Sequence, residues 1–396
     1  MISTAPTTRN RTLKSRTLYL WQDNALTNFS EQIWREYYLT VAYINALLQR
    51  VDNVVTDGPE DESELQKIIS EAKILKAWCY FDLLRFYAPA YSEAVLDRDG
   101  IILKDRLELD FLPRSSVKTC VETINRLFEE AGEVENDSPV YYLGTAALNA
   151  LRAEFELYLG RYDKVVEYGS PLMAGVESRW TEASYEDLWS DDASDDRIFA
   201  PYIFDSFYTG LCYDKEIGDY FRLSDDVAYV DGDIRKEWSE YSGPMGAVRC
   251  LGKYNRMYYE NTEVRYINSL RYSGVCFTVA EAYARSGNET EAIAIMNKYL
   301  SARGASALPS SIGGDGLVEA ILKEKQKEFV GEGTRYFDLK RLGRNIPRYD
   351  DKGGRVSEIR SDDYRMLLPI PKSEYKYNKN ITEANQNPHW AYEKTE

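Results

Sequence analysis

The sequence predicts a mostly α-helical protein in which irregular helix pairs enclose a long aromatic-rich insertion. Three observations support this fold class. Apolar residues recur with helical spacing over most of the chain outside residues 174–264. Glycine turns join consecutive helices of similar pattern. Within residues 174–264 the helical periodicity fades, and Gly, Asp, Ser and Tyr predominate.

We expect a single domain spanning residues 1–396. Its helical framework comprises residues 26–173 and 265–345, an irregular portion occupies approximately residues 174–264, and a tail covers residues 346–396. A weakly patterned stretch as long as this irregular portion is usually functional. We therefore place ligand binding within the irregular portion.

The first part of the framework is expected to hold successive amphipathic helices. Asp57-Gly58-Pro59 interrupts the first helix. Pro89 ends the second, because proline lacks the backbone N–H that a continuing helix needs. The expected helices span residues 31–51, 63–87, 119–131, 145–159 and 164–173.

The second part of the framework repeats a pattern found in the first. The segment Phe155–Val166 resembles Ala280–Ile295, because in each a helix ends in a glycine turn and a polar residue begins its partner. This is the arrangement of tetratricopeptide helix pairs, but the pairs do not keep the usual period of about 34 residues. The remaining expected helices span residues 269–285, 289–300, 316–330 and 336–342, and strand-like stretches span residues 197–204 and 248–254.

The composition excludes several classes of function. A net charge of −16 repels nucleic acid and anionic lipid, so we expect no nucleic-acid partner. No apolar run approaches the ~18 residues that span a membrane. The lone histidine, His389, cannot supply a two-histidine metal site. We expect no metal and no cofactor. The cysteines form no CxxC pair and are expected to be buried free thiols: Cys79, Cys120, Cys212, Cys250 and Cys276.

The stretch Lys323–Arg344, here called the signature stretch, combines carboxylates, arginines and a Gly-Glu-Gly turn. The turn is not a phosphate loop, because it lacks the GxxxxGK[ST] pattern and no strand precedes it. Glu324 and Glu328 lie one helical turn apart and would suit an acid–base pair.

A structural role for the signature stretch is the interpretation that we prefer. In this interpretation Glu324, Glu328 or Glu332 pairs with Arg335 or Arg341 and joins one helix to the next. Gly333 supplies a helix end with positive φ.

The aromatic insertion offers the better candidate for ligand binding. Sugars present apolar C–H faces that stack on aromatic rings, while charged and amide side chains bond their hydroxyls. Taken singly, each ring is more commonly a packing residue. The predicted ligand-binding residues are Tyr208, Tyr213, Asp214, Tyr220, Phe221 and Arg222.

Four motifs in order resemble the SusD/RagB family. They are EAKILKAWCYFDLLRFY at residues 71–87, AEAYARSGN at residues 280–288, the signature stretch, and LPIP with QNP at residues 368–371 and 386–388. In the signature stretch the matching positions include Glu324, Glu328, Glu332, Gly333, Arg335, Asp338 and Arg341. The resemblance implies that these residues are architectural, as are Trp189, Asp233 and Arg235.

The resemblance also implies a function. Proteins of this family are non-enzymatic outer-membrane lipoproteins of Bacteroidetes that capture nutrients, usually glycans, at the extracellular face for a TonB-dependent transporter of the SusC type. No lipid-bearing cysteine lies near Met1. We therefore expect the leader and the lipidated cysteine to be missing from this chain. Two other functions remain open, namely peptide capture by the same kind of lid and a tetratricopeptide scaffold for protein partners. A glycosidase with a carboxylate pair is the enzymatic alternative.

Overall fold

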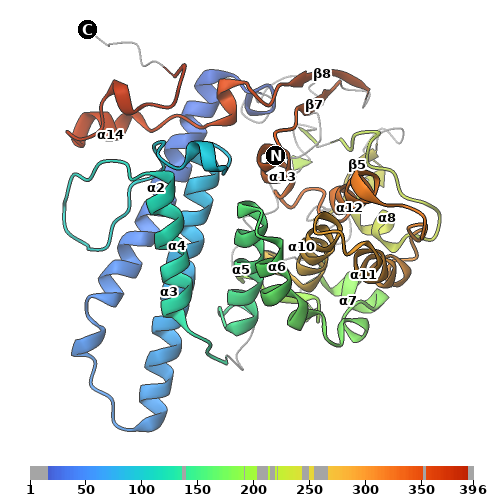
Figure 1. Ribbon diagram of the computed structural model, residues 1–396, viewed down its shortest axis with the longest axis horizontal. Helices are drawn as coiled ribbons and strands as arrows, with labels where there is room; N and C mark the ends of the chain where they lie inside the picture. Colours follow the sequence, from blue (N-terminus) through green and yellow to red (C-terminus); the bar gives the residue numbers. More distant parts are fainter. Residues whose placement is uncertain are drawn as a thin grey trace.

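The computed structural model describes residues 17–135, 140–190, 192–202, 213–214, 219–220, 222–242, 249–253, 266–350 and 354–390. Long helices dominate these residues, and the prediction of a mostly helical fold is confirmed (Figure 1). Among the described residues, no helix is both long and apolar enough to cross a membrane.

Three helices form one side of the molecule, namely α2 (Asp23–Leu48), α3 (Pro59–Tyr87) and α4 (Val117–Ala131) (Figure 1). Helix α3 begins earlier than predicted, because Pro59 is well suited to the first turn of a helix. Ser116 caps α4 by accepting a hydrogen bond from the Thr119 N–H at 3.1 Å.

Two helix pairs, each made of consecutive helices, belong to the rest of the framework. They are α5 (Thr145–Leu159) with α6 (Tyr162–Gly169), and α10 (Tyr272–Arg285) with α11 (Glu289–Ala302). Gly160 ends α5 in the left-handed conformation, with φ of 73°. Two further helices follow, α12 (Gly314–Glu328) and α13 (Arg335–Arg341).

Short elements fill the spaces between the long helices. Each strand belongs to a two-stranded antiparallel pair: β1 (Arg197–Phe199) with β6 (Leu270–Arg271), β2 (Tyr213–Asp214) with β3 (Asp219–Tyr220), β4 (Glu240–Ser242) with β5 (Arg249–Leu251), and β7 (Ile346–Tyr349) with β8 (Arg355–Ile359). Short α-helices are α7 (Glu182–Asp187), α8 (Ile234–Ser239) and α14 (Lys372–Tyr377). Short 3₁₀ turns are Val51–Asn53, Glu93–Val95, Ser170–Met173, Val176–Ser178, Tyr364–Met366 and Glu383–Asn385.

The tail is fastened to α2 and α3 by side chains that bond backbone groups. Ser30 of α2 donates to the Pro369 carbonyl at 2.6 Å. Asn387 donates to the carbonyls of Tyr87 and Leu368 at 2.9 and 2.7 Å. These bonds explain the closing motif, because its amide side chain satisfies backbone groups that burial removes from water.

Four of the predicted buried thiols are confirmed, since Cys79, Cys120, Cys250 and Cys276 are buried and no disulfide joins them. Cys212 lies outside the described residues. The predicted strand at residues 197–204 is shorter than expected, and the start of the predicted helix at residues 269–285 forms β6 instead.

Candidate functional site

The predicted ligand-binding residues fall partly within a short hairpin. Tyr208 and Phe221 lie outside the described residues. Tyr213 and Tyr220 are directly opposite each other in the antiparallel pair of β2 and β3. Residues paired in this way occupy the same face of a two-stranded ribbon. The backbone therefore brings two of the predicted aromatic positions together.

The polar members of the predicted site follow the same register. Asp214 pairs with Asp219 and so occupies the opposite face of the ribbon from the tyrosines. Arg222 is half-buried and forms an isolated antiparallel bridge with Cys250. Through this bridge, a residue close to the end of the hairpin pairs with β5.

An exposed pair of tyrosines that the sequence did not single out lies near the segment that follows β1. Tyr141 and Tyr142 are 41% and 44% exposed, and their ring centroids are 5.0 Å apart at an interplanar angle of 50°. They precede α5, where the Tyr-Tyr dipeptide falls outside any helical apolar stripe. From the sequence alone, this position could have indicated that these rings are not core residues.

Hydrogen bonds place this tyrosine pair next to the strand that enters the insertion. The Ala200 N–H donates to the Val140 carbonyl at 2.8 Å. On the other edge of the same strand, Tyr202 bridges Tyr266, with ring centroids 4.9 Å apart. Tyr202 and Tyr266 are therefore further aromatic side chains beside this segment of the insertion.

The carboxylates of the signature stretch are buried and paired. Glu328 is fully buried, accepts a hydrogen bond from Arg271 at 2.7 Å and also accepts one from the Tyr299 hydroxyl. Burial favours the neutral acid, but Arg271 and neighbouring cations outweigh it and lower the pKa of Glu328 to about 2. Glu332 bonds Arg271 at 2.9 Å and Lys253 at 2.7 Å.

The predicted partners within the signature stretch are wrong. Glu324 pairs with Arg235 at 2.8 Å, and Arg235 also pairs with Asp233 at 2.7 Å. Arg341 pairs instead with Glu281, its Nη1 lying 2.9 Å from Oε1. Arg335 takes part in none of these pairs. The stretch does join elements through charges. Some of its partners come from distant segments, such as Arg235, Arg271 and Glu281, whereas Asp338 pairs within the stretch with Lys325 and Arg341.

Most other predicted structural features of this part of the chain are confirmed. Gly333 has φ of 85°, in the left-handed region as predicted, but it lies in the turn before α13 and does not end a helix, since α12 ends at Glu328. Trp189 is buried, and the Asp233–Arg235 pair is also buried. Asp338 bonds Lys325 at 3.0 Å. These residues hold the framework together, in agreement with a structural role.

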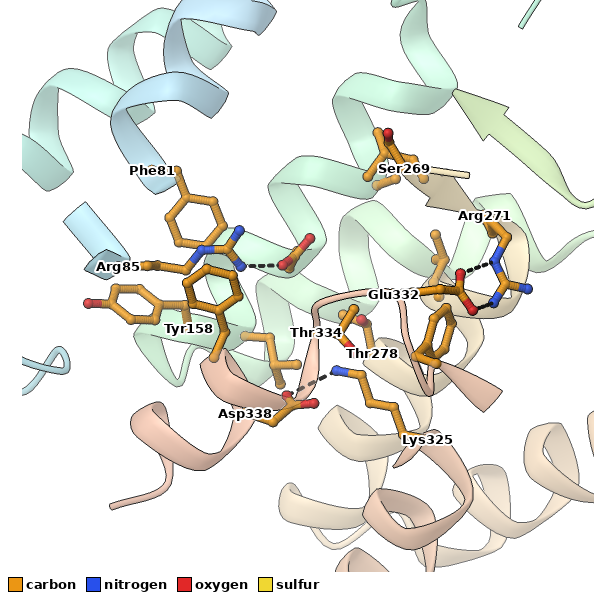
Figure 2. Close-up of a pocket in the computed structure, with 18 of the residues that line it drawn as sticks. Phe81, Arg85, Tyr158, Ser269, Arg271, Thr278, Lys325, Glu332, Thr334 and Asp338 are labelled. Carbon is orange, nitrogen blue, oxygen red and sulfur yellow. Dashed lines mark hydrogen bonds and ion pairs between the residues drawn. The ribbon is translucent and has the colours of Figure 1, made fainter. Parts of the chain in front are cut away.

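A cavity lies between α3, α5, α10, α12 and α13 (Figure 2). On one wall the Arg85 guanidinium lies between the rings of Phe81 and Phe337, 4.1 and 4.0 Å from their centroids. Arg85 also pairs with Glu154 at 2.5 Å. The aromatic sandwich and the carboxylate together hold this cation in place.

The other walls of the cavity also carry charges that are already paired. Figure 2 shows Lys325 directed at Asp338, and Arg271 directed at Glu332. The cavity volume is about 100 Å³. Ligand pockets usually enclose roughly 300 Å³ or more. Its size suits a few water molecules, and its paired charges leave no carboxylate available as a catalytic acid or base.

A larger depression runs along α2 and is here called the α2 groove. It lies between α2, the loop of residues 102–112 and α14, and has a volume of about 290 Å³. Among the described residues, no group of three or more His, Cys, Asp or Glu side chains is arranged to hold a metal ion.

Comparison with known proteins gives matches over nearly the whole chain. A family model described as the SusD family matches residues 153–390. A second, described as starch-binding associating with outer membrane, matches residues 6–147. The SusD-like protein P38 of Formosa agariphila is 22% identical over 418 residues, covering 86% of this chain and 78% of that protein.

Solved structures share the fold. A putative sugar binding protein from Bacteroides vulgatus superposes with a TM-score of 0.82 at 19% identity, over 98% of this chain and 92% of that one. A SusD superfamily protein from Bacteroides thetaiotaomicron gives 0.79 at 23% identity, over 98% and 93%. Surface glycan-binding protein A from Bacteroides uniformis gives 0.74 at 18% identity, over 98% and 91%.

Proposed function

The chain belongs to the SusD family, and from this membership we propose that it is a non-catalytic cell-surface protein that binds oligosaccharides or polysaccharides. The bound glycan would be delivered to a TonB-dependent outer-membrane transporter of the SusC type. The observation that carries this proposal is the SusD family match over residues 153–390. The outer-membrane description of the match over residues 6–147 supports the same location. Attachment would be through an N-terminal lipid.

The proposed glycan site is the aromatic hairpin and its surroundings. Tyr213 and Tyr220 would stack on sugar rings, since their positions share one face of the ribbon. Asp214 and Arg222 would bond hydroxyl groups, with Tyr208 and Phe221 completing the surface. The exposed pair Tyr141–Tyr142 would offer a second aromatic platform before α5.

We propose that the protein is non-catalytic because the candidate acids are already engaged in ion pairs. Glu324 and Glu328 are engaged by Arg235 and Arg271. A general acid needs a raised pKa and contact with substrate, whereas the pKa of Glu328 is lowered to about 2. The site that would bind glycan is a surface for stacking, not an enclosed pocket.

An affinity gel tests the proposed glycan site. We expect Tyr213→Ala and Tyr220→Ala each to weaken retention by polysaccharide about five- to tenfold, since a lost stacking contact is worth roughly 1 kcal/mol. Tyr43→Ala is the control, because Tyr43 is a 68% exposed tyrosine on α2. Unchanged retention of both hairpin variants across a glycan panel would remove these residues from the site. Binding of peptide pools and no glycan would favour the peptide-capture alternative.

A further inference from the structure

Arg348 of β7 is a buried arginine without an acidic partner. It is 6% exposed, and it takes part in no ion pair with the residues that the structure describes. Within the same residues its Nη1 donates only to the carbonyl of the preceding Pro347, at 3.4 Å. Its Nε and Nη2 are buried and have no hydrogen-bond partner there. Buried arginines are normally paired, so this one requires an explanation.

The Nε and Nη2 atoms of an arginine form a fork that matches two oxygens of an oxyanion. Elsewhere in this chain the same fork holds a carboxylate. Arg365 binds Asp363 through Nε and Nη2 at 2.9 and 2.7 Å, and Arg235 binds Asp233 at the same two distances. Arg348 differs, because no group of the described residues meets its fork.

Aromatic rings hold the Arg348 guanidinium in place. It lies 4.9 Å from the ring centroid of Tyr19 and 5.3 Å from that of Trp21. The Tyr19 hydroxyl accepts a hydrogen bond from the Tyr349 N–H at 2.9 Å, which ties this segment to β7. Trp21 is fully buried and has φ of 54°, a strained conformation for a residue with a side chain. The fork is therefore positioned before an anion arrives.

The electrostatic surroundings of Arg348 are positive. Burial lowers the pKa of Arg348 to about 10, and the neighbouring Arg365 acts in the same direction, whereas no carboxylate of the described residues opposes them. The carboxylates of this region already have partners, namely Asp226 with the Tyr349 hydroxyl, Asp350 with the Gly354 N–H and Asp363 with Arg365. A buried cation in such surroundings is stabilised by an incoming anion.

The strand that carries Arg348 contacts the insertion near the proposed glycan site. Figure 1 shows β7 and β8 together at one end of the molecule. The Tyr349 hydroxyl donates to Asp226, which follows Arg222 of the proposed site by four residues. Of the two rings beside the Arg348 guanidinium, Tyr19 is the half-buried one. An anion would therefore approach the fork past Tyr19.

We propose that the Arg348 fork binds an acidic group of the ligand, either a carboxylate or a sulfate ester, so that the glycan recognised by this protein is an acidic one. Two parallel N–H···O bonds hold the acidic group, and the Tyr19 ring moves aside to admit it. That the acidic group belongs to a glycan rests on the proposed function, whereas recognition of an oxyanion follows from the fork alone.

Calorimetry with paired oligosaccharides distinguishes the two sources of the acidic group. One pair is an oligogalacturonate and its methyl ester, and the other is a sulfated galactan oligosaccharide and its desulfated form. The acidic member of one pair should bind about tenfold more tightly or better, because charge-assisted hydrogen bonds distinguish the two. The net charge of −16 favours the neutral members. Equal affinity within both pairs, or tighter binding of the neutral members, overturns the inference and leaves the proposed function standing.

Variants locate the recognition at the fork. Arg348→Met removes the fork and should abolish the preference for the acidic oligosaccharide. Arg348→Lys keeps the charge without the fork and should lose most of that preference. Arg360→Met is the control, since Arg360 uses the same two nitrogens to bind Asp362 on the surface, with its side chain 73% exposed. A preference that survives Arg348→Met would place the anion elsewhere and overturn the inference.

Thermal unfolding tests the fork without any glycan. Arg348→Met should leave Tm unchanged or raise it, because it removes a buried charge that has no partner. Arg235→Met strips Asp233 and Glu324 of their partner and should lower Tm. Sodium acetate or sodium sulfate should raise Tm more in the unmodified protein than in Arg348→Met. If no glycan binds, the proposed function fails and this comparison decides the inference. Equal salt shifts in the two proteins, or a loss in Arg348→Met as large as in Arg235→Met, would overturn it.

Discussion

At the residue scale, the buried glutamates of the signature stretch are paired with a cation from a distant part of the chain. Arg271 bonds Glu328, Glu332 and Asp196, all of them buried. Removing one member of such a set leaves an uncompensated buried charge, which is strongly destabilising. The cost of leaving a buried charge unpaired explains why these charged residues occur together. No catalytic role is needed to explain the arrangement of the stretch.

The sequence predicted that these carboxylates are paired, but it could not identify their partners. Glu328 and Arg271 are 57 residues apart in the chain. Helical periodicity describes which residues share a face of one helix, and it carries no information about which distant cation faces them. Arg335 and Arg341 were the nearest arginines in the sequence, and proximity in sequence was misleading here.

Lys340 provides a prediction at the same scale. It is buried, and its Nζ donates to the Arg85 carbonyl at 2.5 Å, near the C-terminus of α3. Burial, reinforced by Arg85, lowers the pKa of Lys340 from 10.5 to about 7. Between these values the unfolded chain binds more protons than the folded one. Stability should therefore rise with pH from about 7 to 10, by up to about 1.4 kcal/mol per pH unit from this group.

Urea unfolding at pH 6, 7.5 and 9 checks this prediction. Lys340→Met removes the titrating group, so the free energy of unfolding of the variant relative to the unmodified protein should be most favourable at pH 6. A difference between the two proteins that stays constant across this range would show that Lys340 does not titrate as described.

At the scale of elements, close approach of helices depends on small residues. Gly169 at the end of α6 faces α10, and a Cβ atom at this position would lie 2.5 Å from Val279 Cγ2. Val279 is fully buried, and its β-branched side chain has little freedom to move. The contact between the two helix pairs therefore requires glycine.

Substitution of Gly169 tests this contact. Gly169→Ala should lower the free energy of unfolding by about 1–3 kcal/mol, because extra atoms in a packed interface force neighbours apart. Gly316→Ala in α12 is the matched control. Its Cβ would meet only Ile312 Cγ1 at 3.8 Å, so it should be neutral or stabilising by up to about 1 kcal/mol. Thermal unfolding of both variants measures the contrast, and equal effects would refute the packing argument.

Long helices were predictable, and of the short elements α13, β1 and β5 were predicted while others were missed. Residues 145–159 form α5 as expected, because apolar spacing and a glycine stop both act locally. The hairpin of β7 and β8 and the short helices α7, α8 and α14 were missed. Such elements are too short for periodicity to accumulate, and tertiary contacts decide them instead.

At the scale of the whole molecule, the proposed binding features are separate from the structural framework. Buried ion pairs and the tail contacts hold the helices, while the aromatic hairpin and Tyr141–Tyr142 lie outside this framework. The motifs in the sequence were sufficient to predict the family because they encode the framework. They could not predict Tyr141–Tyr142 as an exposed aromatic pair, because the pair lies outside the motifs, and its position outside any helical stripe indicates only that the rings are not core residues.

The most direct test of the proposed function measures retention and turnover together on the same polysaccharide panel. The unmodified protein should be retained by at least one polysaccharide, and prolonged incubation should release no new reducing ends. The double variant Tyr213→Ala, Tyr220→Ala should lose most of that retention. Release of reducing ends that is abolished by Glu328→Gln, or full retention of the double variant, would contradict a non-catalytic glycan-binding surface at the aromatic hairpin.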